Sequence, residues 1–313
     1  SWFYVMVVVT VLLLTELKHT FTEFAQRMKN DEMITLAKFL AISGIILPML
    51  PHKNLIPDIN LTPYSIWLAT VVVSGISYLS YLLKRYVFHE SGTLVSGIIG
   101  GLYSSTATIS VLARKSRKAS EQEATDYVAA MLLAVSMMFL RFMILILIFS
   151  REIFLSIYPY LLTMAVVAAI VAWFIHSRQK RPEGQSAETE EDDSSNPLEF
   201  KVALIFAILF VIFTFLTHYT LVYAGTGGLN LLSFVSGFSD ITPFILNLLQ
   251  NTGSVAALII TACSMQAIIS NIMVNMFYAL FFAGKGSKLR PWILGGFGVV
   301  IVCNLVLLLF FYI

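Results

Sequence analysis

Two charged side chains lie inside apolar stretches of this sequence, where ionic groups are rare. Asp240 lies in NLLSFVSGFSDITPFILNLL and Arg141 lies in AVSMMFLRFMILILIF. A lone ionised carboxylate at the centre of a bilayer costs about 3 kcal/mol or more, so such residues usually face the protein interior. We therefore expect Asp240 to be an ion ligand or a proton carrier. Structural roles stay open beside this one. Asp240 could cap a half-helix beginning at Thr242-Pro243, and Arg141 could pair with an acid or clamp backbone carbonyls.

Small hydroxyl side chains and glycines interrupt the apolar segment Gly92–Lys118. Its middle holds Gly100-Gly101, followed within a few residues by a run of serine and threonine. Adjacent glycines weaken a helix by about 1 kcal/mol each, and the hydroxyls compete for helix hydrogen bonds. At membrane depth a break is tolerated only where protein or a water-filled cavity covers it. The segment is expected to form two half-helices that meet at a polar tip; one spanning helix with small packing residues is the alternative.

A second interrupted segment, Leu229–Gln250, resembles the first. An offset of 136 residues aligns Gly101–Thr106 with Gly237–Thr242, and an offset of 134 aligns Ser136 with Ser270. Hydroxyl, amide and carboxylate oxygens suit a hard cation or proton coupling, whereas half-helix N-termini suit an anion equally well. The sign of the ion therefore stays open. The predicted ion-binding residues are Ser104, Ser105, Thr106, Asp240, Thr242, Asn271 and Arg141.

The composition places the chain among integral membrane proteins. It is 58% hydrophobic and only 12% charged, and its basic residues lie in short loops, which argues against nucleic acid as a partner. We expect an all-α polytopic membrane protein with about eight spanning helices and two broken, re-entrant segments in an inverted repeat. The expected spans are Trp2–Leu14, Met33–Leu50, Tyr64–Leu83, Tyr127–Ser150, Ile153–Ile175, Phe200–Thr217, Val255–Ala283 and Trp292–Ile313.

The chain is expected to divide into four parts. Residues 1–32 are interpreted as the remnant of a truncated N-terminal helix with its linker, and residues 33–176 as the first membrane half. Residues 177–199 form a polar cytoplasmic linker with a basic start and an acidic end, typical of a solvated loop. Residues 200–313 form the second membrane half.

The distribution of Lys and Arg favours re-entrant segments. If both interrupted segments leave on the side they entered, nearly all of the basic residues share one face, with only Lys53 and Arg151 opposite. If both segments cross, the split becomes about even. Cytoplasmic loops collect Lys and Arg, so the re-entrant arrangement is preferred. Broken helices in inverted repeats are a recurring plan of secondary transporters.

Four sequence stretches resemble a known family. LPMLPHKNLIPDINLTPYSIW, GIIGGLYSSTATISVLARKSRK, SGFSDITPFILNLL and SNIMVN are similar to the C-terminal membrane domain of unknown function of MgtC/SapB-family proteins. The likeness covers about Glu32 to Lys288, and GGLYSSTAT followed by LAR is its most specific part. The resemblance implies a multi-pass protein of the bacterial inner membrane with a magnesium-linked transport role.

The leading hypothesis is a secondary ion transporter or channel-like carrier whose site lies at the two broken segments. The alternative is a non-transporting regulatory or scaffolding membrane protein, with the acidic stretch Glu188–Asp193 as a docking loop. An enzyme is not expected, because no nucleophile–base set or pair of intramembrane carboxylates is evident. The expected partners are the lipid bilayer and a small ion, with no cofactor. A homo-oligomer is left open.

Overall fold

A computed structural model describes most of the chain. The described residues are 30–56, 59–88, 92–117, 121–178, 200–250, 256–284 and 287–312, with Ala119 and six isolated positions before Asn30. The expected helix Trp2–Leu14, the linker 177–199 and its acidic stretch lie largely outside them. The chain divides into two compact units, residues 1–49 and residues 50–313.

The first unit contains one apolar helical run. It begins as α2 (Asn30–Ala41), widens into a π-helical turn (Ile42–Ile46) and ends as α3 (Leu47–Met49). The run Met33–Met49 is apolar but shorter than the other candidate spans. Pro51 follows, where the backbone leaves the helix.

The second unit is built from helices, which confirms the expected all-α polytopic fold. Within the described residues, seven helices are long and apolar enough to cross a membrane. An eighth helix, α9, is short and lies between two of them in the chain. The helices are α4 (Pro63–Leu82, with a π-helical extension Leu83–Val87), α5 (Thr93–Lys115), α6 (Glu121–Phe149), α7 (Arg151–Ser177), α8 (Phe200–Ser236), α9 (Ile241–Gln250), α10 (Ala257–Ala283) and α11 (Arg290–Tyr312).

Helix α8 differs from the expected span Phe200–Thr217, because it continues beyond Thr217. The residues that follow, His218 to Ala224, include neither glycine nor proline, so nothing stops the helix there. The first interruption is at Gly225, with φ 59° and ψ −153°. That conformation is open to glycine and strained for other residues. Helix α8 is therefore two helices joined at Gly225.

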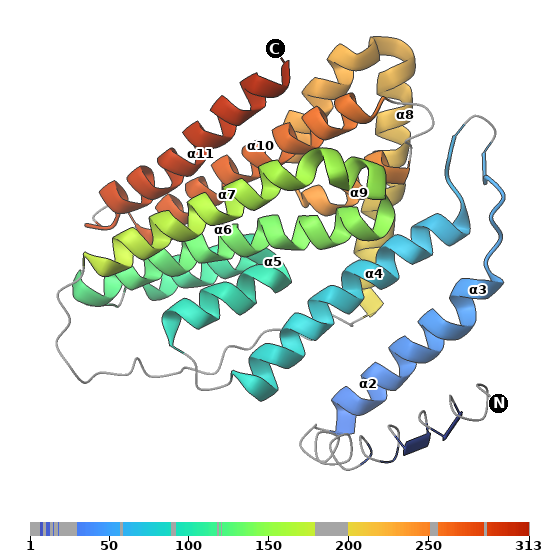
Figure 1. Ribbon diagram of the computed structural model, residues 1–313, viewed down its shortest axis with the longest axis horizontal. Helices are drawn as coiled ribbons and strands as arrows, with labels where there is room; N and C mark the ends of the chain where they lie inside the picture. Colours follow the sequence, from blue (N-terminus) through green and yellow to red (C-terminus); the bar gives the residue numbers. More distant parts are fainter. Residues whose placement is uncertain are drawn as a thin grey trace. The chain divides into compact units, whose positions relative to one another are not determined.

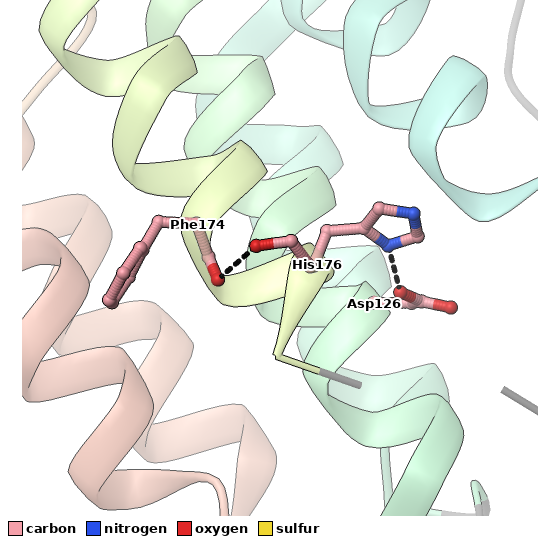
Figure 2. A network of polar contacts seen from close by, with 4 residues as sticks. Asp126, Phe174 and His176 are labelled. Atoms are coloured by element: carbon pink, nitrogen blue, oxygen red, sulfur yellow. Dashed lines mark hydrogen bonds and ion pairs between the residues drawn. The ribbon is translucent and has the colours of Figure 1, made fainter. Parts of the chain in front are cut away.

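The helix directions follow from contacts at the helix ends. His176 Nδ1 lies 2.6 Å from an Asp126 carboxylate oxygen, so the end of α7 meets the start of α6 and the two helices are antiparallel (Figure 2). Arg117 follows the end of α5 and donates hydrogen bonds to the carbonyls of Phe281 and Phe282, in the last turn of α10. Only five residues separate the end of α5 from the start of α6. Helix α6 therefore begins where α10 ends, and these two helices run in opposite directions (Figure 1).

The opposite end of the bundle gathers the start of α4 and the end of α9. Asn60 Nδ2 donates to the Gln250 carbonyl at 2.9 Å, and Gln250 Nε2 donates to the Ser65 carbonyl at 3.4 Å. Helix α4 is fixed at this end by a capping box, in which Thr62 and Ser65 each bond the other's backbone N–H. The end where α5, α7 and α10 finish is called the basic end, because its described basic residues are Lys84, Arg85, Arg114, Lys115, Arg117, Arg178, Lys288 and Arg290.

Accessibility labelling tests this arrangement. Single cysteines in place of Lys84, Arg114 and Arg178 are expected to react with a membrane-impermeant reagent from one side. Cysteines in place of Lys53 and Arg151 are expected to react only from the other side. Lys285, which the charge pattern groups with the first set, lies outside the described residues. Labelling of Arg114 and Arg151 from the same side would contradict the helix directions.

Candidate functional site

The first break lies in α5, where the sequence predicts it. Ser104 has φ −159° and ψ 107°, an extended backbone within an otherwise helical segment. Its hydroxyl accepts a hydrogen bond from the Ala107 N–H at 3.4 Å. An extended residue whose side chain accepts from the third residue on is an N-cap. Ser104 therefore begins a new half-helix that runs from Ser105 to Lys115.

The two halves of α5 fold back on each other. A Cβ atom added to Gly100 would lie 2.5 Å from the side-chain oxygen of Thr108. Eight residues along a continuous helix would be about 12 Å apart. Each half has about eleven residues and so spans roughly 16 Å, about half of the ~30 Å hydrocarbon core. The segment is therefore a hairpin whose tip lies near mid-depth, which confirms the expected half-helices.

The second break follows α8 and is also confirmed. Helix α8 ends at Ser236, residues Gly237 to Asp240 form a turn, and α9 begins at Ile241. An Asp240 carboxylate oxygen accepts from the Thr242 N–H at 3.0 Å, so Asp240 caps α9 as the structural alternative proposes. Phe238, Ser239 and Asp240 are exposed, whereas α9 is buried from Ile241 to Leu249. A helix that is apolar all round belongs inside a protein.

Each break packs on the following long helix in the same register. At the first break, Cβ atoms added to Gly97 and Gly101 would lie 2.3 Å and 2.5 Å from the backbone of Ala130 and Ala134 on α6. At the second, a Cβ on Gly237 would lie 2.3 Å from the side chain of Ser270 on α10. Two polar contacts precede it: Ser233 to Gln266 at 2.9 Å and Cys263 to Asn230 at 3.4 Å. In all five pairs the partners are 33 positions apart.

This common register fixes which residues correspond. The contacts at the first break map onto those at the second by an offset of 136 residues, the offset that aligns Gly101 with Gly237 in the sequence. Ala134 therefore corresponds to Ser270, and the expected match of Ser136 with Ser270 is not reproduced. Ser136 instead donates to the Ala165 carbonyl on α7 at 2.8 Å. Because α6 and α10 are antiparallel, the two broken segments enter the bundle from opposite ends.

Arg141 links the two breaks. It lies on α6, which packs against both α5 and α9. Its Nη1 donates to the Tyr103 carbonyl at 2.8 Å, directly before the cap of the second half-helix. The Asp240 carboxylate lies within electrostatic range of the guanidinium, but no ion pair of 4 Å or less joins the two described side chains. The Arg141 Nε is buried without a hydrogen-bond partner. Arg141 is therefore a carbonyl clamp with one donor left over.

Amide side chains from α10 satisfy the carbonyls of the second break. Asn271 Nδ2 donates to the Gly237 carbonyl at 3.2 Å, and Asn275 Nδ2 donates to Asn271 Oδ1 at 3.1 Å. Ser270 donates to the Phe234 carbonyl at 2.7 Å. A backbone carbonyl can only accept, so this chain fixes the orientation of both amides. It leaves Asn275 Oδ1 buried without a partner.

The other predicted site residues divide between the two breaks. Ser105 and Thr106 follow the Ser104 cap, with Ser105 buried and Thr106 half-buried; Thr242 is buried in the first turn of α9. Asn247, also on α9, is a polar residue that the sequence reasoning missed, and it donates to the Thr214 hydroxyl of α8 at 2.6 Å. A lone amide inside the apolar run PFILNLL was the available signal.

The fold and these paired breaks define a multi-pass helical membrane protein. Residues 71–283 match the family model described as Domain of unknown function (DUF4010), more than half of the chain, and the chain belongs to that family. The chain is also similar to an "Uncharacterized protein" of Aquifex aeolicus (strain VF5), with 25% identity over 227 residues, covering 71% of this chain and 96% of the relative. No solved structure matches the chain significantly.

Glycine substitutions test the close packing at the breaks. Gly101→Ala and Gly237→Ala place a methyl group where the Ala134 backbone and the Ser270 side chain already lie. We expect each to destabilise the protein by about 1–3 kcal/mol, because a tightly packed interface must move. Melting of the detergent-purified protein measures this loss. The matched control is Gly298→Ala on α11, where an added Cβ meets nothing within 4 Å. Equal melting temperatures for all three variants would contradict the packing.

Proposed function

We propose that this protein is a secondary ion carrier of the bacterial inner membrane, with its site where the two broken segments converge. The observation that carries the proposal is the pairing of the two breaks. Each is a half-helix that stops at a glycine-containing turn, packs on the next helix at a 33-residue register and restarts under a side-chain cap. Discontinuous helices facing each other from opposite sides are the recurring binding-site plan of secondary transporters.

The membrane halves, in this proposal, form an inverted repeat. The antiparallel directions of α6 and α10 support it, because each carries its broken segment in the same register but from the opposite end. The aligned positions Ser104 and Asp240, 136 residues apart, both cap the second half-helix. An inverted repeat allows one half to rock against the other around a site at mid-depth.

The orientation and setting follow from charge and resemblance. The basic end is assigned to the cytoplasm, since cytoplasmic loops collect Lys and Arg. The likeness of GGLYSSTAT and LAR to MgtC/SapB-family membrane domains supports the bacterial inner membrane and a role in ion transport. We propose ion movement rather than enzymatic chemistry, and the site itself needs no cofactor. Whether copies of the chain assemble does not alter the site, because both breaks belong to one chain.

Reconstitution of the full chain into lipid vesicles tests the proposal. Purified protein in phosphatidylethanolamine/phosphatidylglycerol vesicles is expected to catalyse ion-gradient-dependent flux above that of protein-free vesicles. The panel covers salts that vary the cation at fixed anion and the anion at fixed cation. Absence of flux and of binding for every salt, with the protein folded, would favour the alternative regulatory or scaffolding role.

Arg141→Gln probes the site itself. Glutamine retains an amide that can donate to the Tyr103 carbonyl but removes the charge shared between the two breaks. We expect flux to fall at least tenfold, because a buried charge acts strongly on an ion in a medium of low dielectric constant. Arg151→Gln is the control, since Arg151 is exposed at the start of α7. Normal flux in Arg141→Gln, with a melting temperature near that of the control, would exclude Arg141 from the site.

A further inference from the structure

We propose that the ion bound between the two breaks is a small monovalent anion. The inference rests on the proposed carrier function and assigns the sign of the charge of its substrate. The sequence leaves this sign open, because hydroxyls and amides serve cations and anions alike. The polar groups at the two breaks separate the possibilities, since those that would bind a cation are bonded within the protein and those that would bind an anion are left available.

The carbonyl groups at the breaks are bonded within the protein. In a broken helix, the carbonyls that end the first half are the groups that coordinate a cation. Here the Tyr103 carbonyl accepts from Arg141, the Gly237 carbonyl from Asn271 and the Phe234 carbonyl from Ser270. The Ser236 carbonyl likewise accepts from the Ser239 hydroxyl at 3.1 Å. Protein donors therefore occupy the negative ends of both first halves.

The oxygen ligands that remain are too few for a metal cation. Calcium takes six to eight oxygens, and magnesium takes six in a strict octahedron. Among the described residues at the breaks, Asp240 supplies the only carboxylate, and one of its oxygens already accepts from the Thr242 N–H. Asn275 adds one unpartnered amide oxygen on α10, one turn beyond Asn271.

The half-helix N-termini point the other way. A helix leaves its first four N–H groups without helical partners and carries about half a positive charge at that end. Two such ends are present, the half-helix beginning at Ser105 and helix α9 beginning at Ile241. The capping bonds from Ser104 and Asp240 each satisfy one N–H. Anions bind at helix N-termini because the remaining N–H groups and the dipole both favour negative charge.

Arg141 provides the independent indication of a ligand. Its guanidinium lies beside the first break and within electrostatic range of the second, and one of its donors, Nε, is buried with nothing to bond. A buried donor without a partner is costly, and an anion seated between the breaks would satisfy it. Arginine also presents its donors in a planar fork suited to oxyanions and carboxylates.

The charge balance sets the valence. Arg141 and Asp240 carry opposite formal charges, so together they leave no net ionic charge at the breaks. What remains is roughly half a positive charge at each of the two N-termini, or about one in total. One negative charge balances that excess, whereas a divalent anion would be left short of one positive charge. Chloride, nitrate and formate fit the balance, and sulfate serves as the divalent comparison.

Asp240→Asn separates an anion site from a cation site, because the two predict opposite results. Asparagine caps a helix about as well as aspartate, so α9 should keep its start. At an anion site the variant removes a repelling charge, and the apparent Kd for nitrate and formate should fall by about tenfold. At a cation site the same change removes the only carboxylate and should abolish binding. Arg151→Gln, at an exposed position at one end of the bundle, is the matched control.

The measurement is salt-dependent melting of the full detergent-purified chain, followed by vesicle flux with the same salts. Stabilisation that tracks chloride, nitrate or formate at constant sodium, and strengthens in Asp240→Asn, supports the inference. Stabilisation or flux that tracks sodium, potassium or magnesium at constant anion, and vanishes in Asp240→Asn, overturns it while leaving the carrier function standing. No response of the folded protein to any ion overturns the anion site and the carrier function together.

Discussion

A helix that stops inside a membrane leaves backbone N–H and C=O groups that lipid cannot bond, and the rest of this molecule is arranged around that constraint. The carbonyls at the two breaks are met by Arg141, Asn271 and Ser270, and the N–H groups by the caps Ser104 and Asp240. These partners reach the breaks only because glycines let the broken segments lie directly on α6 and α10. Close backbone packing is thus the condition for the polar site.

The sequence predicted the existence of the breaks well, because their cause is local. Paired glycines followed by hydroxyls weaken a helix wherever they occur, and the apolar flanks of Gly100–Thr106 and Gly237–Thr242 place the weakness at membrane depth. The fold class followed from the length and polarity of the apolar runs. The end of α8 was placed too early, at Thr217, because a change in polarity is a weaker stop signal than the absence of glycine until Gly225.

Side-chain partnerships were harder to predict, because they depend on contacts between distant segments. Nothing in the sequence around Arg141 distinguishes an ion pair with Asp240 from a clamp on Tyr103, and only the fold brings Tyr103 within 2.8 Å. The same holds for Asn247, whose partner Thr214 lies 33 residues away on another helix. The alignment of Ser136 with Ser270 failed because matching serines outweighed constant spacing, whereas the packing follows the spacing.

Arg114 and Arg117 tie the end of the first hairpin to the other half of the molecule. Arg117 donates to the last carbonyls of α10, and the guanidinium carbon of Arg114 lies 4.4 Å from the centre of the Phe282 ring. At the far end of α10, Asn60 and Gln250 instead join α4 to the short helix α9. The two ends of α10 are thus anchored to different parts of the bundle. A relative rotation of the halves that keeps the arginine contacts must use the basic end as its hinge and displace the far end most.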